Sequence, residues 1–183
     1  MEFSELKETQ WSDLKEIYSE AFPILERKPV FVLKRFVKTG KAQIFTATED
    51  DVLLGFAVVI PYEDMALVDY LAVSSKFRGK GTGTFIMQEL CKHFQDKKII
   101  IEIEKLDEEA VNTKQRVARR KFYLKNGFKA PHIYTNSSMG DMEILNYGGK
   151  VSPKEYLRMQ KYLLGDLFYK LSNVTLTRSG EYE

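Results

Sequence analysis

The chain has 183 residues, of which 44% are hydrophobic and 30% charged, a composition typical of globular rather than disordered proteins. We expect one domain over residues 1–183. The formal net charge of +2 is too small to predict nucleic-acid or membrane binding from the electrostatic field alone. Cys91 is the only cysteine, which excludes an intramolecular disulfide and favours a cytoplasmic location. No run of about 20 apolar residues predicts a membrane span.

The first part of the chain predicts two helices followed by three strands. Apolar residues recur at helical spacing over residues 10–22, and a second helix is predicted between Pro29 and Gly40. Short segments rich in β-branched and aromatic residues then predict strands. These segments are residues 42–48, 52–60 and 65–73.

The second part alternates between helices and strands. The predicted helices contain Phe85 to Phe94, residues 109–126 and residues 152–172. The predicted strands are residues 98–104, 128–135 and 141–147. This order predicts an α/β fold with a mixed sheet. The terminal helix has enough apolar side chains to be buried, either against the first helices or in a dimer interface.

A glycine-rich turn joins the strand at 65–73 to the following helix. From Arg78 to Thr84 it reads Arg-Gly-Lys-Gly-Thr-Gly-Thr. Glycines allow a backbone to approach a ligand closely, and the start of a helix favours anions, so this turn is suited to a pyrophosphate. It matches neither of the common nucleotide-binding patterns, GxxxxGK[ST] and GxGxxG. A plain turn between a strand and a helix is the alternative.

Two stretches resemble the GNAT superfamily of N-acetyltransferases. Arg78, Gly81 and Gly83 match the family signature Arg/Gln-x-x-Gly-x-Gly, and residues 119–128 resemble its second characteristic stretch. The resemblance covers residues 65–128. It implies a GNAT-type fold, a mixed and mostly antiparallel sheet flanked by helices, splayed between the strands at 65–73 and 98–104.

The resemblance also implies the reaction and the ligand. Acetyl-CoA would be the co-substrate, and its acetyl group would pass to a primary amine of a small molecule or peptide by direct attack in a ternary complex, without a metal. The main chain before the turn would contact pantetheine and the turn would hold the pyrophosphate. The implied binding residues are Leu71, Ala72, Val73, Arg78, Gly79, Lys80, Gly81, Thr82, Gly83, Thr84, Arg116, Arg119 and Tyr123. Arg116 departs from the family pattern, which often has asparagine there.

The transfer requires a proton donor for the leaving thiolate. Tyr123 matches the position where many family members have this general acid. The helical wheel groups it with Arg116, Arg119 and Arg120, so we expect it on the polar side of its helix, away from the core. The opposite side of that wheel carries Val117, Ala118, Phe122 and Leu124.

The transfer also requires a proton acceptor for the attacking ammonium. Glu102 is our first candidate and Asp69, which lies in an otherwise apolar strand, our second, because a buried carboxylate can accept a proton directly or through water. Strand alternation predicts that Glu104 shares a face with Glu102. The alternatives are that Asp69 pairs with an arginine or caps a bulge and that Glu104 is a solvated strand end. A cluster of carboxylates could equally recognise a cationic amine.

Other functions also fit parts of the sequence. A coenzyme A sensor without turnover would keep the glycine turn. An RNA-binding module would use the basic helix at 114–125, although such runs are more often solvated surface. We expect neither nucleic acid nor membrane as a partner, and a homodimer is possible.

Overall fold

The computed structural model describes residues 1–137, 140–172 and 175–178. Its backbone packing defines two compact units, residues 1–61 with 68–93 and residues 62–67 with 94–183. Among the described residues, no helix has both the length and the apolar character that crossing a membrane requires.

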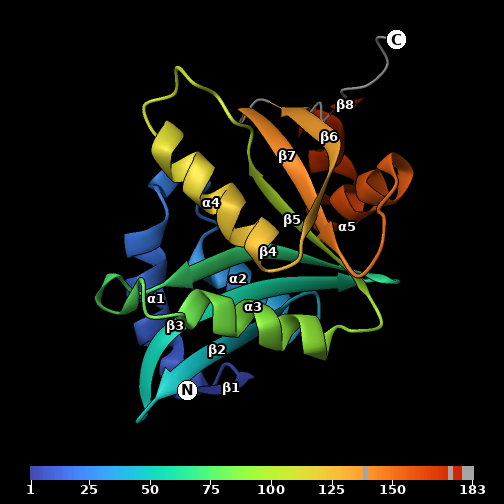
Figure 1. Cartoon of the computed structure of the whole chain (residues 1–183). Coiled ribbons are helices and arrows are strands. Elements are labelled where there is room, and N and C mark those ends of the chain that lie inside the picture. The colour runs from blue at the N-terminus through green and yellow to red at the C-terminus, as the bar shows by residue number, and fades with distance from the viewer. Residues whose placement is uncertain (138–139, 173–174, 179–183) are drawn as a thin grey trace. The chain divides into compact units, whose positions relative to one another are not determined.

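The first unit contains a sheet with strands in the order β1, β2, β3, β4 (Figure 1). Both β1–β2 and β2–β3 are antiparallel pairs. The strands are β1 (Glu2–Glu5), β2 (Gln43–Glu49), β3 (Val52–Tyr62) and β4 (Met65–Val73), the last two continuing into the second unit. The helices are α1 (Trp11–Ala21), α2 (Val30–Lys38) and α3 (Thr82–His93).

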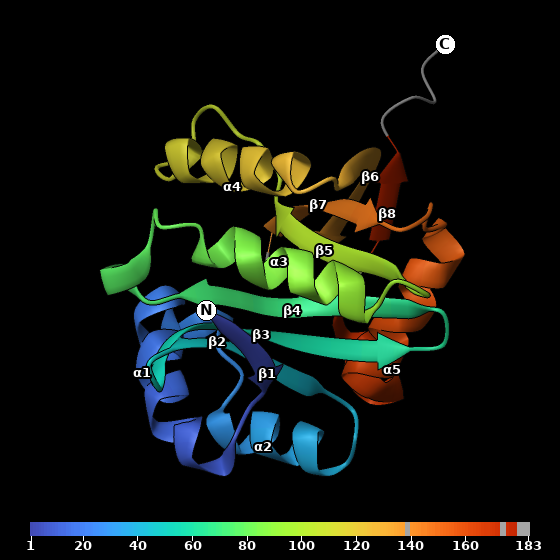
Figure 2. The same cartoon turned by 60° about the horizontal axis from the view of Figure 1, so that its bottom comes forward.

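Both faces of this sheet are covered, as its sequence requires. Residues 53–60 of β3 are all buried, the pattern of a strand with packing on each side. Figure 2 shows α1 and α2 on one face and α3 on the other. The largest buried side chains of these helices are Leu14, Tyr18, Leu33, Ile86, Met87 and Leu90. Apolar burial of this kind is the main stabilising term for the unit.

The second unit contains an antiparallel sheet in the order β5, β7, β6, β8. Its strands are β5 (Lys98–Glu104), β6 (Lys129–Ser137), β7 (Gly140–Tyr147) and β8 (Thr175–Arg178). Its helices are α4 (Thr113–Lys125) and α5 (Pro153–Ser172). The two helices lie on opposite faces of β5 and β7 (Figure 2).

The predicted α/β class with mostly antiparallel strands is confirmed, and the bounds of β4 and β5 match those predicted. Three details differ. The sequence analysis missed the short strands β1 and β8, and α4 begins at Thr113, four residues later than predicted. The helix predicted at 152–172 is interrupted at Gly165, whose φ of 76° and ψ of 161° are not helical. The predicted splay between the strands at 65–73 and 98–104 stays a prediction, as does a single domain.

Candidate active site

The glycine turn has open space on its outer side. Gly79 and Gly81 have φ of +78° and +89°, and a Cβ on either would meet no atom within 4 Å. The helix α3 follows at once, its first bond running from the Phe85 N–H to the Gly81 carbonyl at 2.9 Å. The N–H groups of the first helical turn therefore have no carbonyl acceptor within the helix itself. Open backbone beside a helix start is an arrangement that binds anions.

The two basic side chains of the turn, Arg78 and Lys80, both contact other residues of the chain. Arg78 donates from Nε to the Val73 carbonyl at 3.0 Å and from Nη2 to Glu20 Oε1 at 3.2 Å. The same Glu20 oxygen accepts the Ser75 N–H at 3.0 Å. Lys80 Nζ lies 5.4 Å from the Phe77 ring centroid, within the range of a cation–π contact. Arg78 thus fastens the turn to the end of β4.

Gly55 in β3 supports the end of β4 from the neighbouring strand. A Cβ at Gly55 would lie 2.6 Å from the Ala72 carbonyl oxygen and 3.2 Å from Val73 Cα, so only glycine fits without a shift. Ala72 is buried, whereas Leu71 and Val73 are half-buried. Gly55 was not predicted as part of the site, although a glycine inside a strand is a recognised sign of close backbone approach.

Asp69, the second candidate base, forms an ion pair with a lysine rather than with an arginine. Lys28 Nζ lies 2.8 Å from both Asp69 oxygens and 5.0 Å from the Tyr70 ring centroid. The Lys28 N–H also donates to the Tyr70 hydroxyl at 3.1 Å. The Asp69 carboxylate is therefore neutralised by its own chain.

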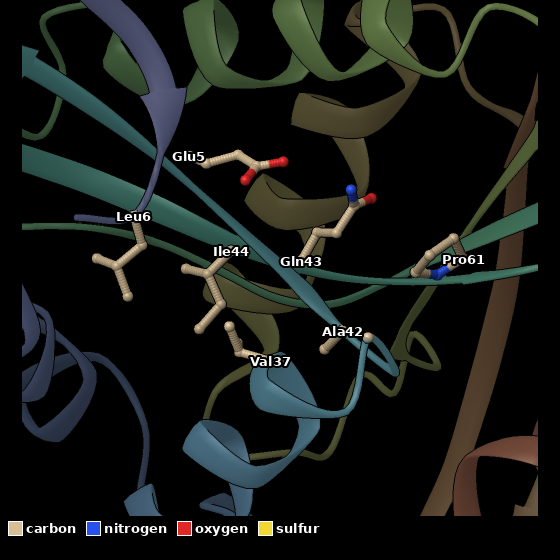
Figure 3. A pocket seen from close by; sticks show the side chains of 8 residues that line it. Glu5, Leu6, Val37, Ala42, Gln43, Ile44 and Pro61 are labelled. Atoms are coloured by element: carbon tan, nitrogen blue, oxygen red, sulfur yellow. The ribbon is translucent and has the colours of Figure 1, made fainter. Parts of the chain in front are cut away.

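A pocket of about 250 Å³ opens elsewhere in the first unit (Figure 3). It lies where Gln43 pairs with Val59, whereas Gly55, next to the end of β4, pairs with Ala47 at the other end of these strands. The pocket is therefore separate from the glycine turn. Its lining consists of Glu5, Leu6, Val37, Gly40, Ala42, Gln43, Ile44 and Pro61.

In the second unit, Tyr123 lies on the inner side of α4, so the predicted orientation of this helix is wrong. Tyr123 is 8% exposed, while Leu124, expected on the core side, is 37% exposed. Burial raises the pKa of the Tyr123 hydroxyl to about 12, and the positive charge of Arg119 opposes this rise. The phenol is therefore protonated throughout the neutral range.

The physical reason for the error is that the arginines of α4 face carboxylates of the sheet. Arg119 Nη1 lies 2.5 Å and Arg116 Nη2 3.3 Å from Glu104, and Arg120 donates to both oxygens of Glu143 at 2.8 and 3.1 Å. Glu143 is 2% exposed. A face that looks polar in sequence thus packs toward the sheet, because its arginines are paired with carboxylates there. The arginines paired in this way, Arg116, Arg119 and Arg120, are three of the basic residues with which an RNA-binding helix would contact phosphates.

Glu102 and Glu104 of β5 have partners on different helices, so the face that strand alternation predicts for both is not reflected in their contacts. Burial favours a raised pKa for Glu104, but hydrogen bonds from Asn112 and Arg119 lower it below the usual value. Glu102 instead accepts a hydrogen bond from Gln160 of α5. Gln160 was not predicted as a site residue, although a glutamine within the apolar stripe of a helix is itself a signal of a buried polar contact.

No group of three or more histidine, cysteine, aspartate or glutamate side chains suited to a metal ion occurs within residues 1–137, 140–172 and 175–178. The candidate residues are thus the glycine turn with Asp69 in the first unit, and Tyr123, Arg116, Arg119 and Glu102 in the second.

Comparison with known proteins identifies the class. Residues 40–130 match the model of the acetyltransferase (GNAT) domain. The chain is 30% identical over 146 residues to YjbC of Bacillus subtilis (strain 168), whose name assigns it to the acetyltransferases; the match covers 75% of this chain and 71% of YjbC. The chain belongs to the GNAT family of acetyltransferases.

Solved structures confirm the GNAT fold. A GNAT-family protein from Bacteroides thetaiotaomicron has a TM-score of 0.73 at 20% identity, covering 92% of this chain and 99% of its own. An aminoglycoside 6'-N-acetyltransferase complexed with coenzyme A has a TM-score of 0.65 at 19% identity, covering 84% of this chain and 99% of its own. At these identities the similarity establishes the fold alone.

Proposed function

We propose that this acyltransferase moves the acetyl group of acetyl-CoA to a primary amine of a small molecule or a peptide. The observation that carries the proposal is the glycine turn, where positive φ at Gly79 and Gly81 leaves open backbone before α3. Membership of the GNAT family and the solved relative that holds coenzyme A support the choice of ligand. A cytoplasmic location and a homodimer stay predictions from the sequence.

The turn would hold the negatively charged part of acetyl-CoA through main-chain N–H groups of its residues and of the first turn of α3. When bound, acetyl-CoA supplies a thioester whose carbonyl carbon accepts the attacking amine. Side chains and main chain assigned to this binding are those of Leu71, Ala72, Val73, Arg78, Gly79, Lys80, Gly81, Thr82, Gly83, Thr84, Arg116, Arg119 and Tyr123.

Glu102 is our proposed proton acceptor for the ammonium, because the Lys28 ammonium already occupies Asp69. The neutral amine nitrogen then forms a bond to the acetyl carbon, the carbon–sulfur bond breaks with departure of the thiolate, and the nitrogen releases its second proton to solvent to leave a neutral amide. The Tyr123 hydroxyl faces the sulfur as a donor in this proposal. The pKa of the Tyr123 hydroxyl, about 12, exceeds the roughly 8.5 of an ordinary thiol. The phenol therefore remains protonated at the end of the step and stabilises the thiolate by donating a hydrogen bond.

The ligand is tested by thermal unfolding of the full chain with millimolar acetyl-CoA. We expect the wild-type Tm to rise with ligand concentration, because a ligand that binds only the folded state stabilises it. Gly81→Glu should abolish this rise by placing a negative charge at the turn. Gly40→Glu is the matched control, since Gly40 also has positive φ and open space but lies at the end of α2. It should keep the rise.

Release of free thiol, measured over a panel of amines, polyamines, aminoglycosides and peptides, tests the reaction itself. Release that depends on one amine class supports the proposal and names its acceptor. Stabilisation by acetyl-CoA without release for any amine would instead indicate a coenzyme A sensor. Equal loss of the Tm rise in Gly81→Glu and Gly40→Glu would contradict the assignment of the turn.

A further inference from the structure

The buried face of α5 carries two polar side chains next to each other. Tyr156 is 1% exposed and Gln160 is 6% exposed, among the apolar side chains of Met159 and Leu163. Burying a polar group is costly unless its hydrogen bonds are made, so both side chains require partners. Their partners lie on the strands below them.

Gln160 and Tyr156 both contact the Glu102 carboxylate. Gln160 Nε2 donates to Glu102 Oε1 and, at 2.9 Å, to the Tyr156 hydroxyl oxygen. That hydroxyl is also hydrogen-bonded to Glu102 and to Thr135 of β6. Burial, followed by the nearby negative charge of Glu102, raises the pKa of Tyr156, so its phenol keeps the proton that it donates to Glu102.

Both of these donors are neutral, and this separates them from the partners of neighbouring carboxylates. Lys28 pairs with Asp69, Arg119 with Glu104 and Arg120 with Glu143. A cationic partner orients a carboxylate but also cancels its charge. An amide and a phenol restrict the rotamers of Glu102 while adding no positive charge to compete with an ammonium ion.

We propose that Gln160 and Tyr156 are positioning residues that hold the Glu102 carboxylate in the orientation from which it receives the proton of the acceptor amine. The inference rests on the proposed function, in which Glu102 is the proton acceptor. It also gives α5, whose partner the sequence left open, a role in the reaction. Glu102 remains the group that contacts the acceptor, and the two α5 residues act through it.

The test is a double-mutant cycle on the full chain, with steady-state kinetics for acetyl-CoA and for the best amine of the panel. Gln160→Met keeps the side-chain length and removes the donor. It should lower kcat about 10-fold, because a misplaced catalytic group loses rate, and leave KM for acetyl-CoA within about two-fold. In the Glu102→Gln background the same substitution should have no further effect. Met159→Leu, on the same buried face, is the control for packing and should keep kcat.

Three results would overturn the proposal: an unchanged kcat in Gln160→Met, an equal loss in both backgrounds, or an equal loss in Met159→Leu. If Gln160→Met does not fold, Tyr156→Phe enters the same cycle, with a smaller expected loss because Gln160 is retained. If the wild-type chain releases thiol with none of the amines in the panel, the proposed function itself is contradicted. Active wild-type with additive losses contradicts only the role of α5.

Discussion

Two strands carry a carboxylate that could serve the reaction, and the two carboxylates have opposite surroundings. On β4, both oxygens of Asp69 lie 2.8 Å from the Lys28 ammonium. On β5, Glu102 accepts hydrogen bonds from the neutral side chains of Gln160 and Tyr156. The sequence ranked Glu102 before Asp69, but it showed neither the lysine beside Asp69 nor the neutral donors beside Glu102.

The difference shows that the partner, rather than the strand position, decides what a buried carboxylate can do. A cation that lies on both oxygens makes an ion pair whose main effect is on stability, because removing either member leaves the other charge uncompensated. Neutral donors add no positive charge of their own to the carboxylate, and a negative charge is what an incoming ammonium requires. The following substitutions test this distinction.

The largest effect is expected for Glu102→Gln, which removes the proposed proton acceptor and keeps the side-chain size. It should lower kcat/KM for the amine by at least about 100-fold, the usual contribution of a general base. Asp69→Asn, the corresponding amide substitution on β4, should lower it by less than about 5-fold. Steady-state kinetics of thiol release measure both, and a larger loss in Asp69→Asn would reverse the assignment.

Lys28→Met should act on stability, because it leaves the largely buried Asp69 carboxylate without its lysine. We expect the free energy of unfolding to fall by about 1–3 kcal/mol in urea denaturation. The double variant Lys28→Met with Asp69→Asn should recover most of this loss, since no charge is then left unpaired. Equal stability of the single and double variants would show that the ion pair is not the stabilising element.

The smallest effect concerns the start of α5, which the proposed positioning requires in place. Hydrogen bonds from Lys98 and from Ser152 lower the pKa of Glu155 to about 2. Because the folded-state pKa lies below the unfolded value, this pair stabilises the protein above about pH 4.5, and the contribution is lost as pH falls toward 2. The pair is close to solvent, so we expect about 1 kcal/mol.

Urea unfolding of wild-type and Glu155→Gln between pH 7 and pH 3 measures this contribution. The two stabilities should converge as the pH falls, because protonation removes in the wild type what the substitution has already removed. A difference between them that stays constant over this range would contradict the role of the Glu155 charge.

The glycine turn was predictable from sequence because all of its parts are adjacent in the chain. Backbone freedom at Gly79 and Gly81, the start of α3 and the end of β4 are local properties. The central strands were predictable for a similar reason, since their apolar residues show which segments are buried.

The surroundings of the proposed catalytic side chains were not predictable, because they join segments far apart in the chain. Glu102 meets Gln160 across 58 positions and Asp69 meets Lys28 across 41. The orientation of α4 was predicted wrongly because the helical wheel treats arginines as exposed, whereas Arg120 pairs with the buried Glu143. The helix break at Gly165 was not predicted, because apolar residues continue at helical spacing on both sides of it.

The register between β5 and β7 makes the second unit intolerant of length changes. Ile103 of β5 pairs with Glu143 and Glu102 pairs with Ile144, so Glu102 and Glu143 are one step apart and contact opposite helices. Inserting or deleting one residue in β5 would exchange these faces. An isoleucine would then meet Gln160, and Glu102 would turn toward the arginines of α4. Among natural variants of this chain, gaps should therefore fall in the connections and spare β5.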